Sequence, residues 1–486
     1  MSDLQKHSGL LLGILVFALM TWLPEPEGLS QKAWYTAAVT LMMGIWWITE
    51  AIPIYATALV PIVFFPMLGI TSITDATTPY ANPIIYLFMG GFFLALGMER
   101  WKLHRRIALS IVSKSGVKPA SIILGFTIAA ASLSMFVSNT ATAIMMLPIA
   151  MSVFELADGA EPNVRKNFEI ALVLSIAYGC NIGGIGTLIG TPPNALLAGF
   201  FQENYGVEIS FLDWMLVGVP VLLVSLPIMF LLLTRVIYPI HMPELKGGQA
   251  FISNELAKMG SMTTQEIRVG IIFLLTALLW IFRPFLDEKI PGMSDAGIAI
   301  SAAILLFMMP SSDQEQPFLL TWEDTKKMPW GVLVLFGGGL SMASAISSTG
   351  LAVWIGDSLS VLEGWPVLLL ILIVVTMMIF LTELTSNTAS TAAFLPILAS
   401  LAYGIGENPL LLAVPAVIAA SCAFMLPVAT PPNAIVYGIG KITIPQMSKA
   451  GFWLNILFIG LITLASYTVI AWVFGVEVGV LPDWAG

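Results

Sequence analysis

Long apolar stretches without a charged residue constrain the fold of this chain more than any other feature. A helix that crosses a bilayer needs about 20 predominantly apolar residues. Stretches of that order occupy residues 8–23, 33–49, 51–74, 76–98, 214–234, 269–282, 296–312 and 450–476. Charged residues make up only 10% of the 486 residues, whereas a soluble protein carries about a quarter. We therefore expect an all-α, polytopic membrane protein.

Two other charge-poor stretches, 119–154 and 364–406, are too long for a single helix and are interrupted only by Glu383. Each has Ser-Asn-Thr near its middle, where the backbone could turn. We therefore expect two re-entrant hairpins that enter and leave on the same side. The long stretches 171–202, 328–356 and 408–440 are each expected to hold a span and a broken or interfacial piece.

The basic residues predict the orientation in the membrane. Counting about eleven spans from a cytoplasmic N-terminus leaves only Lys32, Arg283 and Lys289 in outer loops, so 17 of the 20 Lys and Arg residues face the cytoplasm. Cytoplasmic loops of membrane proteins carry such an excess. The N-terminus is therefore expected to be cytoplasmic and the C-terminus extracytoplasmic.

Three motifs recur in the same order, which indicates an internal duplication. The sequence LFMGG at 87–91 returns as LFGGG at 335–339, SNTA at 138–141 returns at 386–389, and TPPNA at 191–195 returns at 430–434. The polar segment 241–267 joins the copies. Five spans separate the hairpins, and an odd number inverts the second copy. Inverted repeats with interrupted helices in matching places indicate a secondary transporter whose site lies near the membrane midplane.

The repeated motifs have the chemistry of an ion and substrate site. Ser, Asn and Thr side chains cap the helix that follows a break, and their oxygens suit a hard cation. The prolines of TPPN free backbone carbonyls, notably those of Gly190 and Ala429. A cap and a kink would also explain each motif taken singly, but duplication in matching breaks favours a binding site.

The site segments contain no basic side chain. Lys, Arg and His are absent from 119–163, 167–234 and 328–440. An anion bound there would depend on the N-termini of half-helices and on a bound cation. Because burying an uncompensated dianion is very costly, we expect Na⁺ to bind with the substrate.

Other residues have simpler explanations. Glu50 is expected to end a helix and His104 to be solvated, whereas Glu383 could be a proton site or could hold its hairpin by hydrogen bonds. Cys180 and Cys422 lie in apolar runs and are expected to be buried. No HExxH motif and no GxSxG motif with a His partner occurs, so we expect no enzyme. No basic patch suggests nucleic acid, and two occluding hairpins favour alternating access over a channel.

On these motifs the chain resembles the divalent anion:sodium symporter family over essentially its whole length, including the sequence CAFMLPVATPPNA at 422–434. The resemblance implies Na⁺-coupled uptake of a C4 dicarboxylate such as succinate, malate or fumarate in a bacterial inner membrane. It also implies a homodimer embedded in lipid. A transport domain (119–236 and 364–486) would move like an elevator against a scaffold (1–118 and 237–363).

The family pattern also assigns the site. The first Na⁺ site would comprise Ser134, Ser138, Asn139 and Gly190, and the second Thr382, Thr385, Asn387 and Ala429. The dicarboxylate would lie among Ser138, Asn139, Thr140, Thr191, Ser386, Asn387, Thr388, Thr430 and Pro431. A citrate or other tricarboxylate carrier, a sulfate carrier, and a proton-coupled or exchange mode remain alternatives.

Overall fold

The computed structural model describes residues 3–155, 157, 161–241, 245, 248–287, 289–313 and 316–485. Within that part of the chain the regular structure is helical, apart from an isolated bridge between Pro310 and Phe318. The all-α fold is confirmed. Among the described residues, six helices are long and apolar enough to cross a bilayer: Ile73–Arg100, Pro162–Ile185, Phe211–Ile237, Thr264–Leu286, Trp330–Ser348 and Ile444–Phe474; the pair Leu351–Leu362 and Val367–Thr382, bent by 117°, would add a seventh if it forms one span. The count of about eleven spans stays a prediction.

The N-terminal region contains one departure from the expected spans. Its helices are α1 (Asp3–Trp22), α2 (Gln31–Thr49), α3 (Ile54–Thr57), α4 (Val60–Met67), α5 (Ile73–Thr77) and η1 (Thr78–Ala81). The stretch 51–74, expected to be one span, is broken into short helices because Pro53, Pro61 and Pro66 interrupt it. Glu50 ends α2 in the left-handed conformation (φ 46°), which confirms its expected place.

The helix order of the first half returns in the second. The first series is α6 (Pro83–Arg100), α7 (Leu103–Ser113), α8 (Pro119–Ser134), α9 (Asn139–Glu155), α10 (Pro162–Ile185), α11 (Pro192–Tyr205) and α12 (Phe211–Leu231). The second is α16 (Trp330–Ser348), α17 (Leu351–Leu359), α18 (Val367–Thr382), α19 (Asn387–Gly404), α20 (Leu410–Ala420), α21 (Pro431–Gly438) and α22 (Ile444–Ala465). The starts of α17, α18, α19 and α20 each follow their counterparts by 248 positions.

Smaller elements complete the chain. A π-helical turn follows α12 (η2, Leu232–Ile237) and another follows α22 (η5, Ser466–Ile470) before α23 (Ala471–Phe474) and η6 (Asp483–Ala485). Between the two series lie α13 (Gly248–Lys258), α14 (Thr264–Leu286), α15 (Asp295–Met308) and η3 (Trp322–Lys327), and η4 (Ser360–Leu362) follows α17. Of the expected joining segment 241–267, residues 242–244, 246 and 247 lie outside the described part.

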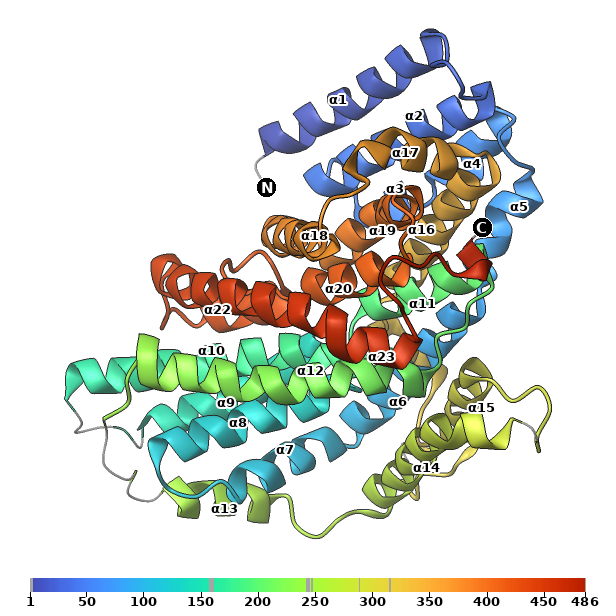
Figure 1. The fold of residues 1–486 in the computed structure, drawn as a ribbon. Helices are drawn as coiled ribbons and strands as arrows, with labels where there is room; N and C mark the ends of the chain where they lie inside the picture. The colour runs from blue at the N-terminus through green and yellow to red at the C-terminus, as the bar shows by residue number, and fades with distance from the viewer. Residues whose placement is uncertain are drawn as a thin grey trace.

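The two series interlock around the broken helices. In Figure 1, α8, α9, α10 and α12 run side by side below α22, and α18, α19 and α20 lie above it. The helix α11 of the first series packs against α19 of the second, and α21 of the second packs against α9 of the first. Each TPPN segment therefore begins a helix that contacts the hairpin of the other copy.

The repeated glycines of LFMGG and LFGGG lie where helices cross closely. A Cβ added to Gly90 of α6 would lie 2.6 Å from the Ala299 backbone in α15. A Cβ added to Gly338 of α16 would lie 2.3 Å from the carbonyl oxygen of Ala58. Small residues permit such contact between membrane helices, so this motif serves packing.

Gly338→Ala should weaken the fold, because the helices must separate to admit the methyl group. We expect the free energy of unfolding to fall by about 1–3 kcal/mol, seen as a lower Tm in detergent. Gly44→Ala in α2 is the control, since no atom lies within 4 Å of its added Cβ, and it should leave the Tm unchanged or slightly higher. Equal Tm values for the two variants would contradict this packing role.

Candidate functional site

The first hairpin turns at Ser-Asn-Thr, as expected. The helix α8 ends at Ser134 and α9 begins at Asn139. The Ser138 Oγ accepts a hydrogen bond from the Ala141 N–H at 3.2 Å, so the serine caps α9. As whole residues, Ser138, Asn139 and Thr140 are all half-buried.

The loop between α10 and α11 lies against this turn. A Cβ added to Gly184 would lie 3.1 Å from the Gly190 carbonyl oxygen and 3.2–3.3 Å from the amide atoms of Asn139. A Cβ added to Gly190 would lie 2.4 Å from the Gly184 carbonyl oxygen, so glycine is needed for this approach. The structure thus brings together Asn139 and Gly190, two residues expected in the first Na⁺ site.

Four oxygens of this hairpin and of the TPPN helix beside it are buried without a hydrogen-bond partner: Ser134 Oγ, Asn139 Oδ1, Thr142 Oγ1 and Asn194 Oδ1. Leaving a buried polar atom unsatisfied costs about 1–3 kcal/mol. Neutral oxygens are what a hard monovalent cation prefers, and no group of three or more His, Cys, Asp and Glu residues among the described residues could hold a metal ion. The cluster therefore fits an alkali cation better than a transition metal.

The second hairpin turns at the equivalent place but with other contacts. The Thr382 hydroxyl lies 2.5 Å from Asn387 Oδ1 and 2.7 Å from the Ala420 carbonyl oxygen. Because the hydroxyl carries one proton, it serves only one of these acceptors fully. Thr385 contacts Ser390 Oγ at 2.5 Å and the Leu381 carbonyl at 2.9 Å. Thr382 and Asn387 therefore meet, whereas among the described residues no hydrogen bond joins either of them to Ala429.

The asparagine of each TPPN motif clamps the loop that precedes it. Asn194 Nδ2 donates to the carbonyls of Gly184 (3.0 Å) and Thr187 (2.8 Å). Asn433 Nδ2 donates to those of Ala423 (3.1 Å) and Leu426 (3.0 Å). In both cases the acceptors lie 10 and 7 positions upstream. Sequence reasoning missed this role, although duplication of the asparagine with the motif was a signal.

The remaining expected substrate residues lie at helix starts. Thr191 and Thr430 are the buried N-caps of α11 and α21, and Thr430 Oγ1 accepts from the Asn433 N–H at 3.3 Å. Thr388 is buried in the first turn of α19, Ser386 is its half-buried N-cap, and Pro431 is exposed at the start of α21. Since α21 packs on α9 and α11 on α19, these helix N-termini lie next to the opposite hairpins.

Glu383 holds the second loop. Its carboxylate oxygens accept hydrogen bonds from the backbone N–H groups of Phe424 (2.7 Å), Met425 (2.9 Å) and Leu426 (3.2 Å), and from the Asn455 amide (2.9 Å). Of the two roles left open for Glu383, this geometry favours bracing. The first hairpin has Met135 at this place, and there the Thr187 hydroxyl donates to the Met135 carbonyl.

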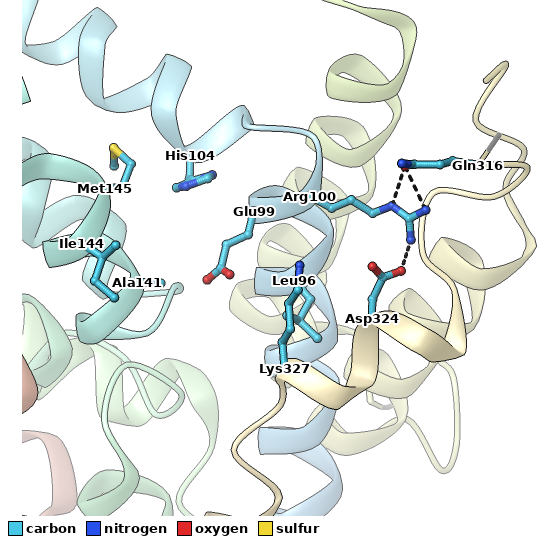
Figure 2. A pocket seen from close by; sticks show the side chains of 10 residues that line it. All are labelled: Leu96, Glu99, Arg100, His104, Ala141, Ile144, Met145, Gln316, Asp324 and Lys327. Atoms are coloured by element: carbon cyan, nitrogen blue, oxygen red, sulfur yellow. Dashed lines mark hydrogen bonds and ion pairs between the residues drawn. The ribbon is translucent and has the colours of Figure 1, made fainter. Parts of the chain in front are cut away.

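A cavity of about 570 Å³ leads toward the first hairpin. Figure 2 shows Ala141, Ile144 and Met145 of α9 on one side and Glu99 on the other. Ala141 directly follows Thr140, so the cavity reaches the first turn of α9. We interpret it as an access path to that turn.

Three basic side chains, those of Arg100, His104 and Lys327, line this cavity, and the first two have partners within the protein. Arg100 points toward Gln316 (3.0 and 3.1 Å) and pairs with Asp324 (Figure 2). His104, expected to be solvated, is half-buried, and its Nδ1 lies 3.1 Å from the Met98 carbonyl oxygen. Burial lowers the pKa of His104, which favours the neutral imidazole. That expectation was therefore wrong: the end of α6 and the cavity wall shield the ring.

Glu383→Ala should destabilise the protein, because three backbone N–H groups lose their acceptor. We expect a loss of several kcal/mol if each unsatisfied group costs about 1–3 kcal/mol, measured as a lower Tm. Glu407→Ala is the control: Glu407 is also buried but accepts one backbone N–H, from Gly479 at 2.8 Å, so its loss should be smaller. A larger effect at Glu407 would refute the bracing role of Glu383.

Comparisons with known proteins agree with this architecture. Residues 4–476 match the family model described as the sodium:sulfate symporter transmembrane region. The chain is 46% identical to the sodium-dependent dicarboxylate transporter SdcS of Staphylococcus saprophyticus over 479 residues, covering 97% of this chain and 92% of that protein. The Staphylococcus aureus protein of the same name matches equally, at 46% identity and the same coverage.

Two solved structures share the fold at low sequence identity. Neisseria gonorrhoeae MtrF, whose structure is described as illuminating a class of antimetabolite efflux pumps, superposes with a TM-score of 0.60 at 14% identity over 98% of this chain and 95% of that one. The Alcanivorax borkumensis YdaH transporter gives 0.60 at 14% identity over 90% and 98%. These likenesses concern the fold alone. By its family match and its 46% identical relatives, the chain is a multi-pass membrane transport protein and belongs to the sodium:sulfate symporter family.

Proposed function

We propose that this protein carries a C4 dicarboxylate, such as succinate, malate or fumarate, across the plasma membrane of a bacterium together with Na⁺. One observation supports the proposal most: the buried amide oxygens of Asn139 and Asn194 lack a hydrogen-bond donor, and both side chains lie against Gly184, next to the Gly190 carbonyl. Such a cluster suits a small cation with neutral oxygen ligands. The relatives named sodium-dependent dicarboxylate transporters add the substrate class.

Charge balance explains why the ion and the substrate would travel together. The site segments carry no Lys, Arg or His, so a bound dicarboxylate gains no basic partner there. The N-termini of α9, α11, α19 and α21 offer partial positive charge, and those of α9 and α19, which have no proline in the first turn, also offer N–H groups, but two full negative charges exceed that. Na⁺ beside each Ser-Asn-Thr turn would supply the missing charge and make uptake dependent on the ion.

We assign the two Na⁺ sites and the substrate site to the residues given by the family pattern. The first site would use Ser134, Ser138, Asn139 and Gly190, the second Thr382, Thr385, Asn387 and Ala429. The dicarboxylate would lie between the two Ser-Asn-Thr turns, near Thr191 and Thr430. Cross-packing of α11 on α19 and α21 on α9 supports this assignment, because it joins each TPPN helix to the opposite hairpin.

We further propose an elevator motion in a homodimer with a cytoplasmic N-terminus. The moving part would comprise 119–236 and 364–486, whose helices α8–α12 and α18–α22 pack among themselves. The cavity at Ala141 lies between α9 of that part and α6 and η3 of the other, as an access path between the two would. The excess of Lys and Arg in one set of loops supports the orientation.

Sulfate is a second candidate substrate, since the matching family model is described by sodium:sulfate symport. Sulfate is also a dianion and would meet the same charge requirement. These substrates can be distinguished by adding unlabelled sulfate, citrate or succinate and measuring how much each reduces the uptake of labelled succinate. On our proposal succinate inhibits uptake strongly, and sulfate and citrate inhibit it weakly. Stronger competition by sulfate would transfer the proposal to that anion.

Uptake of labelled succinate into proteoliposomes should require an inward Na⁺ gradient. Replacing external Na⁺ by choline at constant ionic strength should reduce the initial rate to that of protein-free vesicles, because the dianion then lacks its counter-charge. Equally fast uptake driven by a proton gradient without Na⁺ would contradict Na⁺ coupling.

Ser134→Ala should raise the Na⁺ concentration for half-maximal uptake by about tenfold, equivalent to ~1.4 kcal/mol for one lost oxygen ligand. Thr127→Val on the same helix is the matched control, because Thr127 is equally buried and its hydroxyl donates only to the Ile123 carbonyl of its own helix at 2.9 Å. An unchanged Na⁺ dependence in Ser134→Ala would remove Ser134 from the site.

A further inference from the structure

The helix α10 connects the two broken segments of the protein. Its residues from Phe168 to Ile185 are all buried, and its C-terminal end begins the first loop. There Gly184 contacts the Asn139 amide and the Gly190 carbonyl through the close approach described above. The position of this helix end is therefore tied to the geometry of the first proposed Na⁺ site.

Two side chains of the same helix reach into the loop of the other repeat. Tyr178 OH donates to the Phe424 carbonyl at 2.7 Å. Asn181 Nδ2 lies 3.0 Å from the Ala423 carbonyl oxygen and 3.2 Å from Thr430 Oγ1, with Asn433 Oδ1 at 3.4 Å. Asn181 is 2% exposed, so these bonds form away from water, where losing them is costly.

Helix α10 of the first repeat bonds to the loop of the second repeat, but α20 of the second repeat has no equivalent side chains for the loop of the first. Aligning the TPPN motifs, which are displaced by 239 positions, pairs Tyr178 with Val417 and Asn181 with Ala420, and aligning the starts of α10 and α20, which are displaced by 248, pairs them with Leu426 and Ala429. These residues have no side-chain hydrogen-bonding group. Asn194 Oδ1 in the first repeat accordingly lacks a partner, whereas its counterpart Asn433 Oδ1 faces Asn181. The duplication has therefore diverged so that α10 supports the second loop and α20 gives no such support to the first.

The C-terminal end of α10 lies at the first proposed Na⁺ site, and side chains of the same helix bond to the loop of the second. This arrangement makes the two sites interdependent. An ion that fixes Asn139 and Gly190 fixes the end of α10. Asn181 lies one helical turn before Gly184 and would transmit that placement to Ala423 and Thr430. The second loop would then be ordered before its own ion arrives, which lowers the conformational cost of the second binding event.

We propose that Asn181 is a positioning residue that couples the two Na⁺ sites, so that an ion at the first site raises the affinity of the second. This inference rests on the proposed function, because it requires Na⁺ at both breaks. Asn181 itself contacts neither ion. It acts through Ala423 and Thr430, which lead into and out of the segment that carries the Ala429 carbonyl.

The test is a Na⁺ titration of the purified full-length protein without dicarboxylate, followed by tryptophan fluorescence at constant ionic strength. Trp214 is a built-in reporter, since its Nε1 donates to the Ile185 carbonyl at 2.8 Å. Wild type should give a sigmoidal curve with a Hill coefficient above one. Asn181→Ala should give a hyperbolic curve whose half-saturating Na⁺ concentration is higher by at least about fivefold, the lower end of typical coupling between sites.

Three variants separate coupling from a general loss of stability. Asn181→Leu keeps the branching and the number of side-chain heavy atoms without a donor and should behave like Asn181→Ala even if the latter folds poorly. Ser175→Ala is the matched control on α10, because Ser175 is fully buried and bonds only to the Leu172 carbonyl at 2.7 Å; it should keep the sigmoidal curve. Thermal unfolding without Na⁺ reports any purely structural effect.

The possible outcomes are distinct. A sigmoidal curve retained in both folded Asn181 variants, or a hyperbolic curve in wild type, would overturn the coupling and leave the proposed Na⁺ symport intact. A wild-type protein that does not respond to Na⁺ at all would overturn both proposals.

Discussion

The fold depends on satisfying backbone groups where helices break inside the membrane. At that depth no water is available, and an unpaired N–H or C=O group is costly. The protein meets this requirement with buried side chains: Asn194 and Asn433 bind loop carbonyls, and Glu383 binds three loop N–H groups. Once the loops are held in this way, the carbonyls of Gly190 and Ala429 need not enter a helix.

The two repeats hold their broken loops by different contacts, and we therefore assign the two proposed Na⁺ sites different roles. Next to the first loop, the amide oxygens of Asn139 and Asn194 lack a hydrogen-bond partner; at the second, the buried Ser421 hydroxyl lacks one. The second is braced by Glu383 from its own repeat and by Asn181 from the other. A loop already held by the protein loses little entropy on binding an ion, whereas a loop with unsatisfied acceptors gains more enthalpy from one. On our account the first site responds to Na⁺ and the second is prepared by that response.

Sequence reasoning recovered the parts of this architecture that depend on local chemistry. Ser-Asn-Thr predicted the helix breaks, and the prolines of TPPN predicted that the carbonyls of Gly190 and Ala429 lie outside a helix, because capping and proline act within a few residues. The bracing contacts escaped prediction because they join residues far apart: Asn181 and Ala423 are separated by 242 positions. The stretch 51–74 was expected to be one span because hydropathy outweighed its three prolines. Glu383 was recognised as special, but only the position of Phe424–Leu426 identifies its role.

The central claim is that neutral oxygens and bound Na⁺ replace basic side chains as the partners of a dianion. Equilibrium binding of labelled succinate to the purified protein, measured in Na⁺ and in K⁺ at equal ionic strength, tests it most directly because no gradient or movement is involved. The account predicts saturable binding in Na⁺ and none above background in K⁺, with Na⁺ bound more tightly when succinate is present. Binding of equal affinity in both salts would contradict it.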